Sequence, residues 1–318
     1  MKIYSLRANE NWICDRFVDE WENNNPDLVT TDPNSADVLW LVASWAWNQV
    51  PVSLLTEKKV VATVHHLDLQ KFDEASQQQF AYRDQFIDFY HVPCANTAMQ
   101  IGPYTDKPIW VQPFWVNQNI WFNIAEKQEL RNEIGLPQGK FLVGSFQRDT
   151  EGHDLKSPKL SKGPDLFCDI VEQLHNGNKD VEVVLAGWRR QYVMNRLQQK
   201  NIKFHYYEWA EFELLNKLYN SLDLYLVSAR CEGGPQAVPE CAVTKTPIVS
   251  TRVGLAQRML APESVFDVSR KVTAGPNVNV AFEKVQPYLM PAGFKPFRDF
   301  FNAKFYQSQK ATKASIVK

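Results

Sequence analysis

The sequence has few cysteines, and their arrangement excludes two kinds of small-protein scaffold. The 318 residues include five cysteines, which are scattered and form no C-x-x-C pair. An odd number of dispersed cysteines argues against a disulfide framework and against a structural zinc site. We therefore interpret the cysteines as small buried hydrophobic residues, and we expect no metal centre.

Long apolar runs, an excess of one charge and the glycine pattern of dinucleotide enzymes are also missing. No apolar run approaches the roughly eighteen residues of a membrane-spanning helix. No signal-peptide pattern precedes the first predicted strand, so we expect a cytoplasmic protein. The formal net charge of −1 argues against nucleic acid as the main partner. No G-x-G-x-x-G follows a predicted first strand, which disfavours a dinucleotide oxidoreductase.

The chain does contain enough apolar residues for two cores. Its length exceeds the size at which a single core usually stops growing. Short apolar runs alternate with amphipathic segments along both halves, which predicts an α/β fold with parallel sheets covered by helices. The predicted strands are 2–6, 38–43, 60–64, 90–93 and 109–112 in the first half, and 141–145, 181–186, 202–204, 223–227 and 247–250 in the second.

These two series predict two Rossmann-like domains followed by a terminal segment. We place the first domain at residues 1–125, the second at 126–292 and the terminal segment at 293–318. Phenylalanines recur at helical spacing in residues 293–305, with lysine and arginine between them. The first interpretation is a helix that crosses back and packs its aromatic face on the first domain. The second is an amphipathic helix in peripheral contact with a membrane surface.

The most informative segment is EGGPQAVPE at residues 232–240. Two carboxylates, Glu232 and Glu240, stand eight positions apart and flank a glycine-proline turn into a predicted helix. Pro235 suits the first helical turn because its missing N–H costs nothing there, and the two glycines let the backbone approach a ligand. Free N–H groups at a helix start attract an anion. The segment therefore suits a sugar attached to a phosphate.

A second constellation supplies positive charge. Residues 144–148 end a predicted strand with Arg148, and Lys162 stands at the start of the helix predicted at 164–174. Arg148 and Lys162 together are suited to neutralise the charge that grows on a diphosphate as a sugar departs. The alternative is a solvated basic loop that contains Arg148 and the lysines of residues 156–162.

Two histidines and an aspartate follow the strand predicted at 60–64. Polar side chains directly past the carboxyl end of a strand project into the ligand crevice of an α/β sheet. His65, favoured over His66, is a candidate to bind a sugar hydroxyl or to handle a proton. The alternative is a structural histidine that bonds to the backbone. A metal site is disfavoured because adjacent histidines point in different directions and the sequence suggests no third ligand.

Together these features resemble the family-4 retaining glycosyltransferases, which have two Rossmann-like domains facing a central cleft, the GT-B fold. Residues 232–240 are similar to that family's two-glutamate E-x7-E motif, and residues 144–148 with 162–165 are similar to its diphosphate-binding pair. Residues 111–117 are similar in position to its interdomain segment. One departure is the missing glycine-rich loop after the first strand, where residues 7–12 contain no glycine.

The resemblance implies transfer of a sugar from a nucleotide diphosphate sugar to an acceptor hydroxyl, with retention of the anomeric configuration and without a metal or other cofactor. It implies that Arg148 and Lys162 stabilise the departing diphosphate and that His65 faces the donor sugar. Glu232 would bind the sugar hydroxyls without acting as a nucleophile. The residues implied in donor binding are Gly144, Gly233, Gly234, Pro235, Gln236, Ala237 and, on the ribose, Glu240.

Two other functions stay open at this point. An epimerase or hydrolase of sugar nucleotides would share the fold, as would a non-catalytic protein that binds a carbohydrate or nucleotide. The nucleotide and the sugar are not specified by the sequence. The acceptor is equally open among glycans, lipid-linked sugars, proteins and small molecules. The tryptophans of residues 40–47 suit an acceptor groove that stacks on sugar faces, although core packing is the other use for such residues.

Overall fold

The computed structural model describes residues 1–10, 13–178, 180–268 and 274–306, so Asn11, Trp12 and the end of the tail lie outside the described residues. The chain divides into unit 1, Met1–Trp115 with Met290–Lys318, and unit 2, Val116–Leu289. The sequence placed these divisions after residues 125 and 292. They fall earlier because Val116 forms a parallel bridge with Leu289, which keeps both residues in unit 2.

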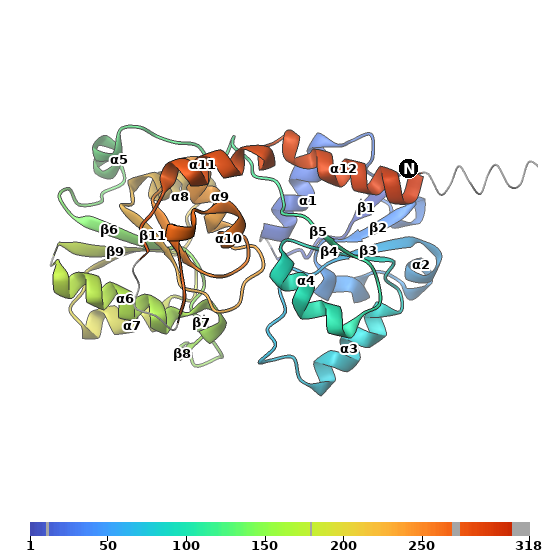
Figure 1. Ribbon diagram of the computed structural model, residues 1–318, viewed down its shortest axis with the longest axis horizontal. Coiled ribbons are helices and arrows are strands. Elements are labelled where there is room, and N and C mark those ends of the chain that lie inside the picture. Colours follow the sequence, from blue (N-terminus) through green and yellow to red (C-terminus); the bar gives the residue numbers. More distant parts are fainter. Residues whose placement is uncertain (11–12, 179, 269–273, 307–318) are drawn as a thin grey trace, which may run out of the picture. The chain divides into compact units, whose positions relative to one another are not determined.

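Unit 1 is built on a parallel sheet in the order β1-β2-β3-β4-β5 (Figure 1). Its strands form at the five apolar runs predicted in the first half. Most of their side chains are buried, because parallel strands are covered by helices on both faces. The strands are β1 (Ile3–Ser5), β2 (Val38–Leu41), β3 (Lys59–Thr63), β4 (Phe89–Val92) and β5 (Ile109–Val111).

An isolated bridge beside β1 shows that the chain winds in both directions from this strand. Ile3 pairs in parallel with Val29 on one side and with Val38 of β2 on the other. The chain therefore moves outward through α1 (Ile13–Asn24) and then returns past β1 to β2. Since crossovers between parallel strands are right-handed, α1 covers one face and the later helices cover the other. These are α2 (Val52–Glu57), α3 (Glu74–Asp84) and α4 (Ala95–Ile101).

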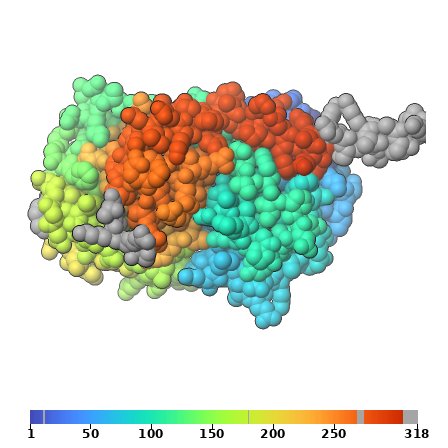
Figure 2. All heavy atoms as spheres, in the orientation of Figure 1, coloured from blue at the N-terminus to red at the C-terminus, as the bar shows by residue number. Residues whose placement is uncertain are grey.

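The C-terminal segment returns to unit 1, as predicted. In α12 (Lys295–Phe301), the fully buried Phe297 and Phe301 lie with ring centroids 5.5 and 5.4 Å from Trp40. Arg298, on the outer side of the helix, makes a paired contact with Asp27 at 3.0 and 2.7 Å; Figure 2 shows this segment in red. Packing thus accounts for the aromatic part of the pattern, and an ion pair accounts for Arg298. Among the described residues, no helix has the length and apolar character to cross a bilayer.

Unit 2 contains a parallel sheet in the order β10-β9-β6-β11-β12-β13. Four of its strands coincide with predicted ones. β10 lies later than the predicted 202–204, because the buried Ile202 belongs to the connection before the strand and its amide donates to the Leu197 carbonyl. The two-residue β13 was not predicted. The strands are β6 (Phe141–Ser145), β9 (Val181–Ala186), β10 (Phe204–Tyr207), β11 (Leu224–Val227), β12 (Ile248–Thr251) and β13 (Val265–Phe266). A separate hairpin joins β7 (Thr150–Glu151) to β8 (Ser157–Pro158).

The strand order of unit 2 reverses next to β6. The chain runs from β6 outward to β9 and β10, and then returns past β6 to β11. In open α/β sheets, ligands bind beyond the carboxyl ends of the strands at such a reversal, here between β6 and β11. The helices of unit 2 are α5 (Lys127–Glu133), α6 (Pro164–Gly177), α7 (Gln191–Gln199), α8 (Phe212–Ser221), α9 (Ala237–Thr244), α10 (Ala256–Met259) and α11 (Val278–Val285) (Figure 1).

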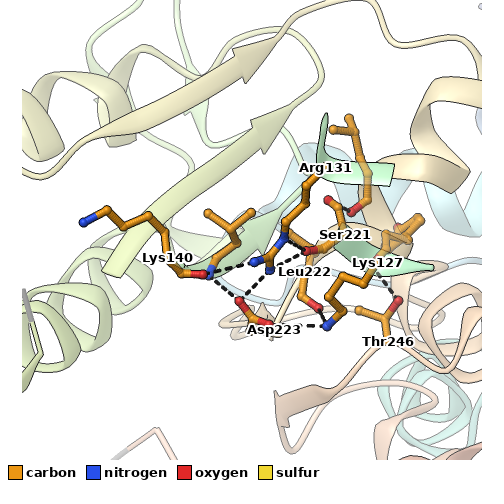
Figure 3. Close-up of polar contacts among 10 residues, drawn as sticks. Lys127, Arg131, Lys140, Ser221, Leu222, Asp223 and Thr246 are labelled. Carbon is orange, nitrogen blue, oxygen red and sulfur yellow. Dashed lines mark hydrogen bonds and ion pairs between the residues drawn. The ribbon is translucent and has the colours of Figure 1, made fainter. Parts of the chain in front are cut away.

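An ion-paired cluster closes the amino edge of this sheet (Figure 3). Arg131 is 5% exposed and donates to the Ser221 carbonyl and, at 2.6 Å, to the Asp223 carboxylate. Asp223 also accepts from the Leu142 amide at 2.8 Å and the Lys127 ammonium at 3.3 Å. Because Ser221 ends α8, Arg131 also stabilises the negative end of that helix. We call Lys127, Arg131 and Asp223 the amino-edge cluster.

Candidate functional site

At the opposite, carboxyl edge of the unit 2 sheet, the segment after β11 lies against the start of α6. The amides of Arg230 and Cys231 donate to the Ser161 carbonyl at 2.8 and 3.0 Å. The Arg230 guanidinium makes a bidentate pair with Asp165 in the first turn of α6, at 2.7 and 2.6 Å. These bonds fix the loop that carries Glu232 beside the loop that carries Lys162.

Gly163 makes this close approach possible. Its φ of +63° is in the left-handed region, and a Cβ at this position would collide with the backbone carbonyl oxygen of Ser228. The preceding carbonyl, that of Lys162, accepts from the Gln147 side chain at 3.0 Å and from the Ser228 hydroxyl at 3.4 Å. The start of α6 is therefore anchored to the ends of both β6 and β11, the two strands that flank the reversal in strand order.

Lys162 and Glu232, which the sequence singled out separately, form an ion pair. Their side chains are 17% and 10% exposed. Burial lowers the pKa of Lys162 to about 7, and the positive charges of Lys159 and Arg148 act in the same direction. The Glu232 carboxylate acts in the opposite direction, because a nearby negative charge favours the ammonium form. An anionic ligand would relieve the repulsion among these cations.

Arg148 lies half-buried beyond the end of β6. Its Nε donates to the Thr150 carbonyl at 2.9 Å, and its guanidinium carbon is 5.6 Å from the ring centroid of Trp188. Burial lowers the pKa of Arg148, and the neighbouring Arg189 guanidinium lowers it further. Within the predicted basic loop, Lys156 is exposed, so the solvated interpretation fits that residue but not Arg148 or Lys162. Together with Glu232, Arg148 and Lys162 form what we call the carboxyl-edge cluster.

A buried ion pair that the sequence analysis missed holds the loop of Arg148. Arg190 and Asp149 are 0% and 1% exposed, and their charged groups lie 2.6 Å apart. Arg190 also donates to the Ala186 carbonyl at 2.9 Å and to the Ser145 hydroxyl at 3.2 Å. The signal was present, because both residues follow closely after buried strands, as Arg148 does. Their role is to position the loop, since each charge is matched by a buried partner.

The glycine-proline turn leads directly into α9, as the sequence predicted. The Val238 amide donates to the Pro235 carbonyl at 3.0 Å, and the Glu240 amide donates to the Gln236 carbonyl at 3.0 Å. Gly254, with a φ of +48°, packs so closely on this turn that a Cβ would meet Gly233 and Pro235. The sequence analysis did not single out Gly254. The turn residues are Gly233, Gly234, Pro235, Gln236 and Ala237, of which Gly233 and Pro235 are buried.

Glu240 lies in the first turn of α9 and is 6% exposed. Its Oε2 accepts a hydrogen bond of 2.8 Å from the Tyr219 hydroxyl. Burial raises the pKa of Tyr219 well above its ordinary value, and the charge of Glu240 acts in the same direction. The rings of Phe146 and Tyr225 surround Tyr219, with centroids 4.8 and 5.4 Å away. The carboxylate is therefore oriented by a protonated phenol that lies in an aromatic cluster.

Gly144 lies inside the sheet, within β6. A Cβ at this position would collide with the Leu222 side chain, and Gly144 pairs with Tyr225 of β11. The absence of a side chain is thus explained by the packing of β6 against the segment that leads into β11. The structure places Gly144 before the carboxyl edge, apart from the loop of residues 146–148.

His65 follows β3 in unit 1. Its Nε2 lies 2.9 Å from the Val42 carbonyl, so this nitrogen carries the proton and Nδ1 is the acceptor of the neutral ring. Burial lowers the pKa of His65, against the effect of the bond to Val42. The ring stacks on Phe114 with centroids 5.7 Å apart and lies 5.8 Å from the Trp45 ring. The backbone bond considered in the alternative interpretation is therefore present, and Nδ1 retains acceptor chemistry.

A second histidine of unit 1, His91, was not singled out by the sequence. It is fully buried, and its Nε2 donates to the Gln112 carbonyl at 2.8 Å. The Nδ1 of the neutral ring therefore accepts from the Thr63 hydroxyl at 3.0 Å. Trp40 donates to the same hydroxyl at 3.0 Å. Burial lowers the pKa of His91 to about 3. Because both ring nitrogens have internal partners, His91 belongs to the core.

Metal-binding side chains do not gather in the part of the chain that the structure describes. Within those ranges, no three His, Cys, Asp or Glu side chains are placed to share an ion. Four of the five cysteines are buried, in agreement with their interpretation as small hydrophobic residues, and Cys231 is half-buried.

Comparison with known families matches part of unit 2. Residues 156–270 match the model of a family described as Glycosyl transferases group 1. This stretch includes Lys162 and the whole of residues 232–240. No curated protein sequence matches the chain.

Solved structures show the same two-domain architecture. Anabaena HepE in complex with UDP is 13% identical, with a TM-score of 0.72, and the alignment covers 95% of this chain and 100% of that one. Sucrose-phosphate synthase from Thermosynechococcus elongatus is 14% identical, with a TM-score of 0.68 and coverage of 92% and 79%. The pneumococcal O-GlcNAc transferase GtfA, with UDP and GlcNAc, is 13% identical, with a TM-score of 0.59 and coverage of 84% and 56%. The fold is therefore that of the GT-B glycosyltransferases, with two Rossmann-like domains.

Proposed function

We propose that this chain is a family-4 retaining glycosyltransferase that transfers a sugar from a nucleotide diphosphate sugar to an acceptor hydroxyl. The observation that carries the proposal is the carboxyl-edge cluster, which lies where the strand order of unit 2 reverses. Lys162 and Glu232 of that cluster also lie inside the segment that matches a glycosyltransferase family. Position, charge and family match thus support a donor site in the same unit.

The leaving diphosphate would be stabilised by Arg148, Lys162 and the start of α9, without a metal. Lys162 has a lowered pKa of about 7 and lies near two other positive groups, so a diphosphate would favour its ammonium form. Negative charge grows on the diphosphate as the sugar departs, and positioned cations stabilise that charge most strongly in the transition state. The amide groups at the start of α9 add a favourable helix dipole.

Binding of the diphosphate would also change the partner of Glu232. In the free protein its carboxylate contacts Lys162. When Lys162 moves to a phosphate oxygen, Glu232 becomes available to accept from hydroxyls of the donor sugar. We assign it to sugar binding and not to a covalent intermediate, so attack by the acceptor would occur on the face that the leaving group departs from.

Glu240 would hold the ribose of the nucleotide. Carboxylates accept hydrogen bonds from both hydroxyls of a diol, and the bond from Tyr219 keeps this one in a fixed orientation. In unit 1, His65 would use Nδ1 as an acceptor for a sugar hydroxyl, because Nε2 already donates to Val42. Both roles depend on hydrogen-bond geometry and not on a change of charge.

The choice of nucleotide is open to direct test, with uridine diphosphate sugars first. Complexes of HepE with UDP and with UDP-glucose and of GtfA with UDP and GlcNAc are known for the structural neighbours. We would measure thermal stabilisation by UDP-, GDP-, ADP-, CMP- and dTDP-sugars, with Glu240→Gln beside the unaltered protein. A ligand at a hundred times its Kd adds roughly 2.7 kcal/mol to stability.

Selective stabilisation by one nucleotide, lost in Glu240→Gln, supports the donor site and identifies the donor for an acceptor search. NMR of the product then reports the anomeric configuration, and inversion would contradict the proposed retention. An epimerised or hydrolysed donor without transfer to any acceptor would favour the epimerase or hydrolase function. No response to any nucleotide would favour a non-catalytic binding protein.

A further inference from the structure

We propose that unit 1 carries a binding site for an uncharged carbohydrate, in the pocket between η2 (Ser44–Gln49) and α3. The pocket has a volume of about 540 Å³, within the range of small-molecule sites. Three aromatic residues, Trp45, Trp47 and Tyr82, supply its apolar surface. We call this the aromatic pocket. In Figure 2, the cyan spheres that include α3 form part of the surface of unit 1.

The aromatic rings of this pocket are exposed to an extent unusual for such large side chains. Trp45 is 48% exposed and Tyr82 is 49% exposed, although burial is the common state of tryptophan. A pyranose ring presents C–H groups on one face, and these pack on the flat apolar face of an indole or phenol ring. The pocket therefore offers two exposed ring surfaces of the kind that a sugar covers.

Amide side chains complete the lining. Asn48, Gln78 and Gln79 line the pocket, and each amide group has donors as well as an acceptor. Sugar hydroxyls likewise donate and accept hydrogen bonds, so an amide side chain can act as donor or as acceptor toward each of them. The described residues that line the pocket include no charged side chain. An anionic ligand would find no counter-charge there, which favours a neutral carbohydrate over a sugar phosphate or a uronic acid.

The charged residues next to the pocket already have partners. Arg83 of α3 donates to the Ser44 carbonyl at 3.2 Å, which ties the two walls together. Glu74 accepts from the Gln78 amide at 3.4 Å. The Trp45 indole N–H donates to the Glu10 carboxylate at 3.1 Å. These contacts hold the walls in place before a ligand arrives, and such preorganisation lowers the entropic cost of binding.

The walls are also fixed by aromatic packing. Trp47 and Tyr82 lie with ring centroids 5.7 Å apart, and both contact Phe86, at 6.1 and 5.5 Å. By contrast, the exposed Trp188 of unit 2 stacks beside two arginine guanidinium groups. That environment suits an anion. The surroundings of Trp45 and Trp188 therefore differ in charge, and the aromatic pocket is the one suited to a neutral sugar.

The pocket lies at the carboxyl edge of the unit 1 sheet, since η2 directly follows β2. This is the edge at which open α/β sheets bind ligands. The Trp45 ring lies 5.8 Å from His65, the residue that we assign to a sugar hydroxyl. The pocket would thus hold the acceptor glycan. That assignment rests on the proposed function, whereas carbohydrate binding itself does not.

The test uses the full chain without nucleotide on an array of neutral and acidic oligosaccharides. We expect binding to neutral glycans, with a loss of roughly tenfold or more in Trp45→Ala from the removed stacking surface. Tyr82→Phe, which keeps the ring, should bind nearly as well as the unaltered protein, and Tyr82→Ala should not. Met99→Ala serves as the matched control, because Met99 is an apolar residue of unit 1 that is 68% exposed outside the pocket.

Three results would overturn the inference: no binding, binding to acidic glycans only, and neutral binding unchanged in Trp45→Ala and Tyr82→Ala. Melting curves show whether each variant is folded. Nucleotide stabilisation, measured separately, reports on unit 2. If it persists while glycan binding is absent, the pocket inference fails and the proposed function stands. Glycan binding without any nucleotide response would leave the pocket as a carbohydrate site and remove its acceptor role.

Discussion

The two edges of the unit 2 sheet carry charged clusters of similar composition and different chemistry. In the amino-edge cluster, Arg131 is matched by the Asp223 carboxylate and by backbone carbonyls. In the carboxyl-edge cluster, Glu232 is the carboxylate in contact with Lys162, while the charges of Arg148 and Lys159 oppose protonation of that lysine. The first arrangement is electrostatically complete, and the second favours an additional anion.

This difference separates stability from binding in one sheet. When one member of a buried ion pair is removed, the protein loses much stability, because the other charge stays buried without its partner. A lysine with a lowered pKa near other cations is instead a candidate for a ligand site. We therefore expect substitutions at the two edges to move different measurements.

The largest effect is expected for Arg131→Met, which breaks the amino-edge cluster. It leaves the Asp223 carboxylate without its main partner. The Asp223 side chain is 24% exposed, so we expect a loss near the lower end of the about 3 to 5 kcal/mol of unfolding free energy that breaking a fully buried pair costs. Urea unfolding measures this. Lys140→Met is the control, because Lys140 belongs to an exposed pair with Asp180. The unfolding free energy lost in Lys140→Met should be far smaller. An Arg131→Met protein as stable as the control would contradict the structural role of this cluster.

Lys162→Met should change the turnover more than the stability. Removal of one group that stabilises the leaving charge lowers kcat on the order of a hundredfold. Lys156→Met is the matched control, since Lys156 lies exposed in the same loop. Steady-state rates and urea unfolding, measured on both variants, test whether the two edges differ in this way. A turnover in Lys162→Met equal to that of the control would remove Lys162 from the mechanism.

Gly163→Ala should disturb the geometry of the carboxyl edge. The new Cβ would collide with the Ser228 carbonyl at a backbone φ of +63°, and we expect a loss of about 1 to 3 kcal/mol. Gly177→Ala, at the other end of α6, is the control, because a Cβ there has no atom within 4 Å. Urea unfolding and nucleotide stabilisation should both decrease in Gly163→Ala. Unchanged values would mean that the start of α6 does not need its close contact with β11.

Much of the architecture was predictable because it depends on local pattern. Parallel strands buried on both faces appear as short apolar runs. These runs located the strands of unit 1 and most strands of unit 2. The prediction for β10 was displaced because Ile202 is buried in the connection before the strand, where an apolar residue resembles the start of a strand. The two residues of β13 are too few to show a period.

Candidate site residues could be named from the sequence where a polar side chain follows a strand end or a helix start. Glu232 and Lys162 were named separately, and the structure brings them into contact. The Asp149 and Arg190 pair was missed, as was the fit of Gly254 against the turn before α9. Their positions after buried strands mark Asp149 and Arg190 as candidates. Their pairing, like the fit of Gly254, depends on contacts between segments distant in sequence, and single-sequence patterns do not report such contacts.

The smallest effect, taken per unit of pH, is a pH dependence from Lys162. Its pKa is about 7 in the folded protein and ordinarily 10.5, so between these values the unfolded chain binds more protons. Stability of the free protein should therefore rise with pH across this range. A nucleotide diphosphate favours the ammonium form, so its affinity should fall above pH 7 by at most about tenfold per pH unit.

Calorimetry in two buffers of different ionisation enthalpy measures the proton taken up when the nucleotide binds. Lys162→Met should abolish both the uptake and the fall in affinity, because it removes the titrating group. Arg131→Met should leave them unchanged, since the amino-edge cluster contains no group that this ligand would contact. Equal proton uptake in Lys162→Met and the unaltered protein would assign the titration to another group and separate Lys162 from the diphosphate.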